Sequence, residues 1–168
     1  MKTINNINKP LAIILFALFG TLASLVITDE SKAQSNIEIL TTYKSESCGC
    51  CVKWIDHVEE NKLTVKAINT IDLNSIKDRY QVPANYRSCH TAISQDGYVF
   101  EGHIPAKYIQ QFLQEKPKNQ VGLVVPGMPV GSPGMEYQNK FNPYVIMAFD
   151  KTGQLTPYAE INQYEDQF

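Results

Sequence analysis

Three of the four cysteines of the chain lie within four consecutive residues. Cys48, Cys50 and Cys51 form the run Cys-Gly-Cys-Cys, and Cys89 follows much later. Cys48 and Cys51 have the Cys-x-x-Cys spacing that serves a redox pair, a structural disulfide or a metal site. Disulfides within so short a segment would close very small loops and restrict the unfolded chain little. The clustering therefore favours reactivity or metal ligation, and the motif alone leaves these two roles open.

Cys50 is the unusual member of this run. A disulfide between adjacent residues would be strained, because their Cα atoms lie closer than disulfide geometry prefers. We therefore expect Cys50, where it is used, to act as a thiolate or as a reserve thiol beside Cys48 and Cys51.

Further candidate ligands lie downstream of the cysteine run. His90 follows Cys89 directly, and His103 ends the sequence Glu-Gly-His. Met128 and Met135 each follow a glycine in a segment rich in proline and glycine. Each residue also has a simpler interpretation, since a lone cysteine is often a small buried apolar residue and methionine often fills gaps at the edge of a core. A lone histidine is likewise more often packed or exposed than ligating.

These candidate donors share one kind of chemistry. Thiolate, thioether and imidazole groups together suit Cu(I), whereas zinc more often takes four Cys or His ligands at regular spacing. The sequence thus predicts a soft-metal site with copper, as Cu(I), for its cofactor. His57 is expected on the polar side of a helix, outside the site. The predicted metal ligands are Cys48, Cys50, Cys51, Cys89, His90, His103, Met128 and Met135.

The first half of the domain must position the cysteine run. Runs of β-branched and aliphatic residues predict strands at 37–43 and 64–68. Apolar residues at helical spacing predict a helix over 51–61. A second helix is predicted over 73–80, with Asp72 as its N-cap.

The second half of the domain must position the downstream candidates. A β-hairpin is predicted over 91–102, followed by a helix that opens near Pro105. Residues 120–135 break the regular pattern and are expected to form an ordered loop, because their prolines exclude a helix interior or a central strand. Strands are predicted at 144–149 and 155–159.

Together these elements place Cys48 where the first strand gives way to the first helix. A helix N-terminus favours a thiolate at that point. The order β-α-β-α-β-β-α, with a Cys-x-x-Cys motif at this junction, predicts an α/β fold of the thioredoxin-like kind with an extra C-terminal strand or hairpin. In that fold the residue before the third strand faces the motif, and redox enzymes carry a cis-proline there.

This chain has Ser88-Cys89-His90 at that position and no proline. A third thiol beside the motif would attack or trap the mixed disulfide of an oxidoreductase. The same thiol would complete a trigonal thiolate site for a metal ion. Cys89 therefore favours the metal interpretation over the redox one.

The N-terminal segment 1–33 has the features of a signal peptide. Two lysines precede an almost unbroken apolar run over residues 11–27, and small residues up to Ala33 suit signal peptidase. The alternative is an uncleaved membrane anchor formed by the same run. Either way we expect residues 34–168 to form a single exported domain, located in the periplasm.

Composition describes an ordinary soluble domain. Hydrophobic residues make up 43% of the chain and charged residues 19%, and the net charge is −2. A mildly acidic domain has no electrostatic reason to bind phosphate backbones, so no nucleic acid partner is expected.

Four motifs follow one another along the chain: residues 43–51 with Trp54 and His57, then 87–92, 101–106 and 122–136. In this order they resemble the motifs of the CopG-type periplasmic copper-resistance proteins. The resemblance extends from about Ile37 to Phe149.

The resemblance implies a thioredoxin-like fold, copper binding by the cysteines with nearby histidines, and a role in copper tolerance. It also allows for interconversion of Cu(I) and Cu(II). The expected function is thus a periplasmic protein that holds Cu(I) through a thiolate cluster, with copper ions and other periplasmic copper-handling proteins as partners. The alternative is a metal-independent thiol–disulfide oxidoreductase that uses Cys48 and Cys51. A third interpretation makes these two an inert disulfide.

Overall fold

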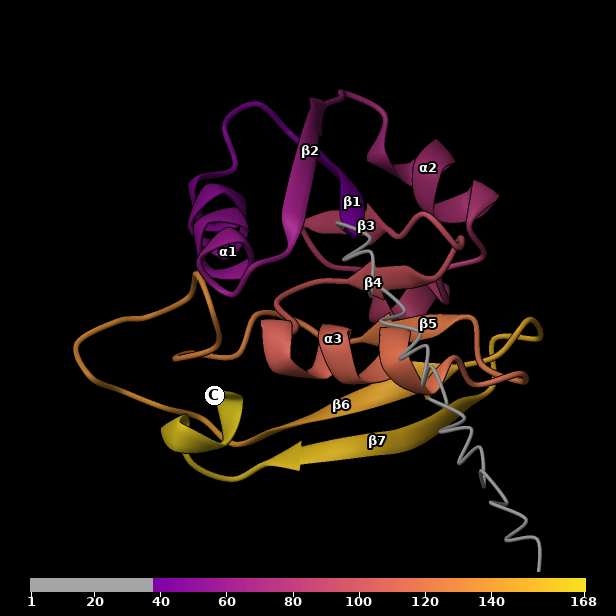
Figure 1. Cartoon of the computed structure of the whole chain (residues 1–168). Helices are drawn as coiled ribbons and strands as arrows, with labels where there is room; N and C mark the ends of the chain where they lie inside the picture. The colour runs from indigo at the N-terminus through magenta and orange to yellow at the C-terminus, as the bar shows by residue number, and fades with distance from the viewer. Residues whose placement is uncertain (1–37) are drawn as a thin grey trace, which may run out of the picture. The chain divides into compact units, whose positions relative to one another are not determined.

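The computed structural model describes residues 38–168 (Figure 1). The predicted signal segment 1–33 and the alternative anchor over 11–27 lie outside the described residues. Within 38–168 the helices are α1 (Gly49–Glu60), α2 (Leu73–Arg79) and α3 (Ala106–Glu115), with short 3-10 turns at Ala84–Tyr86 and Tyr164–Gln167. The strands are β1 (Ile39–Lys44), β2 (Thr64–Asn69), β3 (His90–Ile93), β4 (Val99–Glu101), β5 (Gly122–Val124), β6 (Tyr144–Phe149) and β7 (Leu155–Ile161).

The strands form one mixed sheet in the order β2-β1-β3-β4-β5-β6-β7. β1 pairs parallel with β2 and antiparallel with β3. β4 pairs antiparallel with β3 and parallel with β5, and the last two pairings are antiparallel. The beginning of β3 therefore lies beside the end of β1, where the chain turns into α1. This arrangement brings two distant segments of the sequence to one edge of the sheet.

Side chains alternate between the two faces of the sheet and form two cores. Ala92 and Phe100 belong to the larger core, which includes apolar residues of α1 and α3. Ile93 and Val99 belong to a smaller core on the opposite face, the side on which Lys77 of α2 packs. Figure 1 shows α1 and α2 on opposite sides of β1 and β2. The sheet is thus covered on both faces, as its buried central strands require.

The two helices on the larger core are joined through a histidine. His57 of α1 accepts a hydrogen bond at Nε2 from the backbone N–H of Ala106, at 3.0 Å. That N–H is one of the donors at the start of α3 that no intrahelical acceptor can satisfy. The Trp54 indole N–H donates to the carbonyl of Ile104, at 2.8 Å. His57 therefore has a structural task and lies outside the cysteine cluster, as the sequence predicted.

The predicted mixed α/β class is confirmed, and the elements up to α3 occur in the predicted order. Asp72 caps α2 as predicted, because its carboxylate accepts from the Ser75 N–H at 3.1 Å. One expectation was wrong in part: residues 120–135 are not loop throughout. They begin with β5, whose three residues are all buried. A strand buried on both faces shows no apolar–polar alternation, and this one is too short to reveal itself by length.

The C-terminal segment holds the remaining loop, residues 125–135, in place. The Tyr144 hydroxyl donates to Gln167 Oε1 at 2.8 Å, and Gln167 Nε2 donates to the carbonyl of Gly131 at 3.0 Å. Gln167 is buried, so this polar link lies within the packed domain. The loop is therefore an ordered structure, anchored by residues far along the chain.

Candidate metal centre

The first part of the site is the N-terminus of α1. Cys48 is the N-cap residue of the helix, and the two residues of the Cys-x-x-Cys pair are joined as a disulfide with a Cα–Cα distance of 5.3 Å. Cys50 is a free thiol, and its Sγ lies 3.5 Å from the Sγ of Cys48. Cys51 is fully buried, while the other two are partly exposed. One thiol and one disulfide are thus presented together at the helix start.

The second part of the site is Cys89, immediately before β3. Its Sγ lies 3.8 Å from the Sγ of Cys50, and its carbonyl lies 3.7 Å from the Sγ of Cys51. All four cysteine sulfur atoms lie within 4.8 Å of one another. The structure therefore places Cys89 opposite the cysteine run, in the place where the sequence analysis expected a third thiol.

Two buried histidines complete the cluster on the Cys89 side. Cys89 Sγ lies 3.1 Å from His103 Nε2 and 3.3 Å from His90 Nδ1. Both imidazole rings are fully buried, and they meet edge to face with centroids 5.0 Å apart. Cys89 is therefore the residue common to the thiol group and to the Cys-His-His group.

The ring of His103 is fixed by a backbone carbonyl. His103 Nδ1 lies 2.8 Å from the oxygen of Pro133, which can only accept, so Nδ1 carries the proton. In the neutral ring Nε2 then presents its lone pair toward Cys89. A carbonyl behind one ring nitrogen is the usual way in which proteins orient a metal-ligating histidine.

His90 differs from His103 in its unpaired nitrogen. His90 Nε2 is buried and has no hydrogen-bond partner within the described part of the chain. The ring packs against the Trp54 indole, with centroids 4.3 Å apart. Buried polar atoms are nearly always paired, so this unpaired nitrogen is unusual, whereas Nδ1 is the ring nitrogen that faces Cys89.

The loop 125–135 closes over both halves of the site. Besides the Pro133 carbonyl, it supplies Gly134, which is packed so closely on α1 that a Cβ there would lie 2.5 Å from the Cys50 carbonyl. At its other end the Ser88 hydroxyl donates to the carbonyl of Gly127, at 3.1 Å. The loop thus bridges the start of α1 and the segment before β3.

The two methionines of this region are partly exposed and lie on the loop beside the cysteines and histidines. Met128 is 52% exposed, next to the Gly127 that contacts Ser88. Met135 is half-buried, next to the Gly134 that packs on α1. Both therefore lie on the loop beside the site, and their role as ligands stays a prediction.

Burial shifts the pKa values of the candidate ligands. It raises the pKa of the Cys89 thiol to about 12, with the neighbouring Cys50 acting in the same direction. It lowers the pKa of His90 well below 6.5, helped by His103 and Lys77. Burial also lowers the pKa of His103, against the opposing effects of the Pro133 carbonyl and the charge of Glu136. The imidazoles are therefore neutral and able to bind metal at neutral pH, whereas the thiol must release a proton to do so.

A buried ion pair behind the site was missed by the sequence analysis. Lys77 of α2 lies 2.5 Å from Glu101 of β4, and neither side chain is more than 3% exposed. Charged residues usually lie at the surface, so nothing in the sequence set these two apart. The one available signal was Glu101 itself, which ends an otherwise apolar strand.

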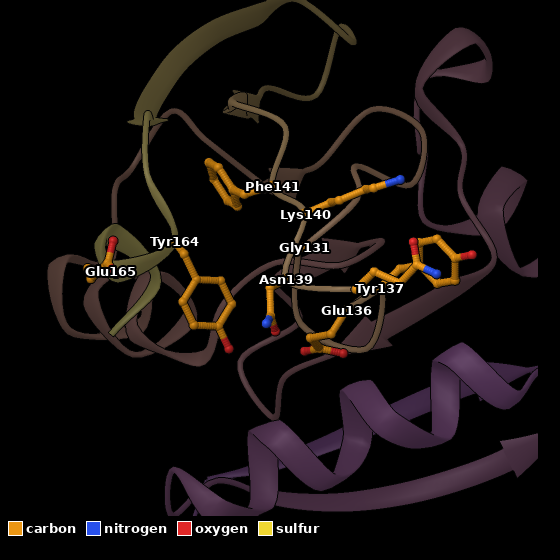
Figure 2. A pocket seen from close by; sticks show the side chains of 9 residues that line it. Gly131, Glu136, Tyr137, Asn139, Lys140, Phe141, Tyr164 and Glu165 are labelled. Atoms are coloured by element: carbon orange, nitrogen blue, oxygen red, sulfur yellow. The ribbon is translucent and has the colours of Figure 1, made fainter.

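One pocket of the domain lies away from the candidate ligands. It has a volume of about 460 Å³ and none of the predicted metal ligands lines it. Figure 2 shows Tyr137, Phe141 and Tyr164 among its walls. The candidate site is thus a packed cluster of side chains rather than part of this cavity. No helix among residues 38–168 has the length and apolar character needed to cross a bilayer.

Fold and site together define a mixed α/β domain with four cysteines and two buried histidines grouped as potential metal ligands. A family described as "Protein of unknown function, DUF411" matches residues 86–135. Two solved structures of copper resistance protein CopG, Form 2 and Form 1, are each 37% identical to the chain. Their TM-scores are 0.70 and 0.69, and each match covers 74% of this chain and 98% of the other.

The chain therefore belongs to the family of copper resistance protein CopG, which confirms the resemblance seen in its motifs. No curated protein matches the chain.

Proposed function

We propose that this protein is an exported copper-binding protein of copper tolerance, which holds Cu(I) through its thiolates and imidazoles. The observation that carries the proposal is the position of Cys89. Its sulfur atom lies within hydrogen-bonding distance of two buried histidines and 3.8 Å from Cys50. Family membership supports copper as the metal, because the related structures are of a copper resistance protein.

The residues present fit copper by two observations. The donors are soft thiols and neutral imidazoles, which suit Cu(I). His90 Nδ1 and His103 Nε2 both face the Cys89 sulfur atom, so both rings are placed to share a metal ion with it. Cys50, Cys89, His90 and His103 would hold the metal whatever the state of the other two cysteines. Met128 and Met135 are proposed as further soft ligands from the covering loop.

The disulfide must be reduced before all four cysteines can bind copper. Cys48 and Cys51 are joined, so neither offers a thiolate until two electrons and two protons have opened the bond to two thiols. After reduction, four sulfur atoms that lie within 4.8 Å of one another become available. That many convergent thiolates suit a small cluster of Cu(I) ions better than a single ion. When bound, copper would supply one-electron redox chemistry between Cu(I) and Cu(II).

Three broader features are part of the proposal. The β-α-β-α-β-β-α order and the position of the Cys-x-x-Cys motif at the first strand–helix junction support a thioredoxin-like classification. The apolar run over 11–27 supports export to the periplasm through a signal peptide cleaved near Ala33. An exported copper protein would exchange its metal with other copper-handling proteins of the same compartment.

Anaerobic titration with Cu(I) against a chromophoric chelator tests the proposal. The protein is expressed from the full chain and reduced before use. Cys89→Ser should lower both the copper stoichiometry and the affinity, because Cys89 is common to the two ligand groups. His57→Ala is the matched control, since this histidine lies outside the cluster. Unchanged stoichiometry and affinity in Cys89→Ser would refute the proposed site.

The disulfide favours a second candidate function, a metal-independent thiol–disulfide oxidoreductase. A free thiol at Cys50, 3.5 Å from Cys48 Sγ, is placed for exchange with the bond between Cys48 and Cys51. An insulin-reduction assay separates the two functions. Turnover that Cys48→Ser abolishes and that added copper leaves unchanged would support the oxidoreductase. An inert disulfide would resist both mild reduction and subsequent alkylation.

A further inference from the structure

A buried ion pair lies directly behind the downstream half of the site. Lys77 and Glu101 are 3% and 0% exposed, and Lys77 Nζ lies 2.5 Å from Glu101 Oε1. Taking two charges out of water is costly, and well-packed apolar residues often stabilise a fold equally well. Stability alone is therefore a weak reason for a charged pair at this point, and its contacts suggest another.

The Glu101 carboxylate holds both ends of the Cys89-His90 dipeptide. Its Oε1 accepts a hydrogen bond from the backbone N–H of Ser88, at 2.5 Å. Its Oε2 accepts one from the hydroxyl of Thr91, at 2.7 Å. Ser88 and Thr91 directly precede and follow the dipeptide. A single side chain thus fixes the segment that presents two of the candidate ligands.

The backbone that follows Glu101 fixes a third candidate ligand, His103. His103 is two residues further on, after Gly102, whose φ of +81° and tight packing admit no side chain. A Cβ at Gly102 would lie 2.9 Å from the Cβ of Ser88. The residues that follow β4 and include His103 are therefore packed on the segment that carries Cys89, and Glu101 connects the two.

Lys77 sets the orientation of the carboxylate. Its ammonium group donates to Glu101 Oε1 and also to the Thr91 hydroxyl, at 2.8 Å. The Thr91 hydroxyl then donates to Glu101 Oε2. This closed ring of hydrogen bonds engages both carboxylate oxygens. Glu101 is therefore occupied with positioning and is not itself placed as a metal ligand.

We propose that Glu101, held in place by Lys77, is a positioning residue of the metal centre, whose hydrogen bonds to Ser88 and Thr91 set the relative placement of Cys89, His90 and His103 before metal binds. The proposal rests on the proposed function, because its readout is copper binding. It assigns to α2, on the opposite face of the sheet from α1, a role in the site.

Two double variants separate the effect of the Glu101 hydrogen bonds on the ligand segment from the effect of the charges of the ion pair. Both Lys77→Leu/Glu101→Gln and Lys77→Leu/Glu101→Leu remove the ion pair. Only the glutamine variant keeps an oxygen that can accept from the Ser88 N–H. In Cu(I) competition against a chelator, the glutamine variant should bind within about threefold of the unaltered protein. The leucine variant should bind about 10- to 100-fold more weakly, the usual effect of losing a group that orients metal ligands.

The ultraviolet absorption and emission of the Cu(I)–thiolate protein give a second readout. They should change in the leucine variant and stay as in the unaltered protein in the glutamine variant. Ile146→Val is the control for stability, because it trims the buried core of β6 without touching the site. Its affinity and spectrum should not change even though its melting temperature falls.

Equal affinity and equal spectra in the two double variants would overturn the inference while leaving the proposed function intact. Failure of the unaltered protein to bind Cu(I) would overturn both. Should the leucine variant not fold, Thr91→Val takes its place, since it removes only the hydrogen bond to Glu101 Oε2 and the one from Lys77. Weaker Cu(I) binding by Thr91→Val would support the inference, and unaltered binding would overturn it.

Discussion

Cys89 connects the two groups of candidate ligands, and its surroundings explain its chemistry. Burial and the nearby Cys50 hold its pKa near 12, so the free thiol is protonated at neutral pH. His103 Nε2, 3.1 Å away, is the acceptor that faces it. A metal ion would displace the thiol proton and take the place of this hydrogen bond. The residue is thus poorly suited to be a free nucleophile and well suited to be a ligand.

The histidines divide into one structural residue and two candidate ligands, and this division can be tested through stability. His57 accepts a hydrogen bond from the first turn of α3, so His57→Ala should destabilise the fold by about 0.5–2 kcal/mol. Cu(I) affinity should not change. Urea unfolding of the reduced, metal-free protein measures the first effect, and chelator competition measures the second.

The pH dependence of the His57→Ala effect follows from the lowered pKa of His57. Burial lowers it below 6.5, against the opposing effects of Glu136 and Glu60. The unfolded state therefore binds a proton first as pH falls, so the stability that His57 contributes is present above 6.5 and lost below it. The stability gap between the unaltered protein and His57→Ala should narrow as the pH falls below 6.5. A constant gap would contradict the assigned hydrogen bond.

Much of the candidate site could be predicted at the residue scale, because Cys and His are few and their spacing carries information. Cys89 does lie close to the other cysteines and, in a second group, to His90 and His103. What could not be predicted are the groups that position them. The Pro133 carbonyl is backbone, and Lys77 and Glu101 look like ordinary surface charges in a sequence. Their roles depend on contacts between segments far apart in the chain.

At the scale of elements, the loop 125–135 and helix α1 form a unit that depends on one glycine. Gly134 has a φ of +85°, and a Cβ there would lie 2.8 Å from the Trp54 backbone nitrogen. The same loop presents the Pro133 carbonyl to His103. The orientation of this histidine therefore depends on how closely the loop packs against the helix.

Gly134→Ala should weaken the packing of the loop 125–135 against helix α1. The left-handed conformation alone costs about 1–2 kcal/mol for alanine, and the forced contact with α1 adds about 1–3 kcal/mol. Gly127→Ala is the matched control, because Gly127 has a φ of +70° and a Cβ added there would meet no atom within 4 Å. Urea unfolding should show a larger loss of stability in Gly134→Ala than in Gly127→Ala. Cu(I) titration should show weaker binding in Gly134→Ala only. Equal effects in the two variants would contradict the role given to the loop.

The elements themselves were predictable where periodicity or length was clear. Strand β6 begins and ends at the predicted residues, and the Asp72 cap marks the start of α2. Strand β5 was not predictable, because its three buried residues merge with the Pro/Gly-rich loop that follows. The thioredoxin-like classification remains a proposal, whereas the mixed sheet with helices on both faces is established.

At the scale of the whole molecule, the sheet explains why the site exists. β3 pairs with β1, so the start of β3 and the end of β1 lie at one edge. The loop 125–135, which follows β5 and is held by Gln167, then covers the cluster. Cysteines separated by a large part of the chain thus meet only in the folded domain. Copper binding by all of them should accordingly be lost on unfolding.

X-ray absorption at the copper edge of freshly loaded, reduced protein tests the central claim most directly. We predict an edge typical of Cu(I), with sulfur as the main scatterer bonded to copper and an added imidazole contribution. Cys89→Ser should lose part of the sulfur signal, because one of the four convergent sulfur atoms is removed. A coordination sphere of oxygen and nitrogen alone, or a spectrum that Cys89→Ser leaves unchanged, would contradict the account.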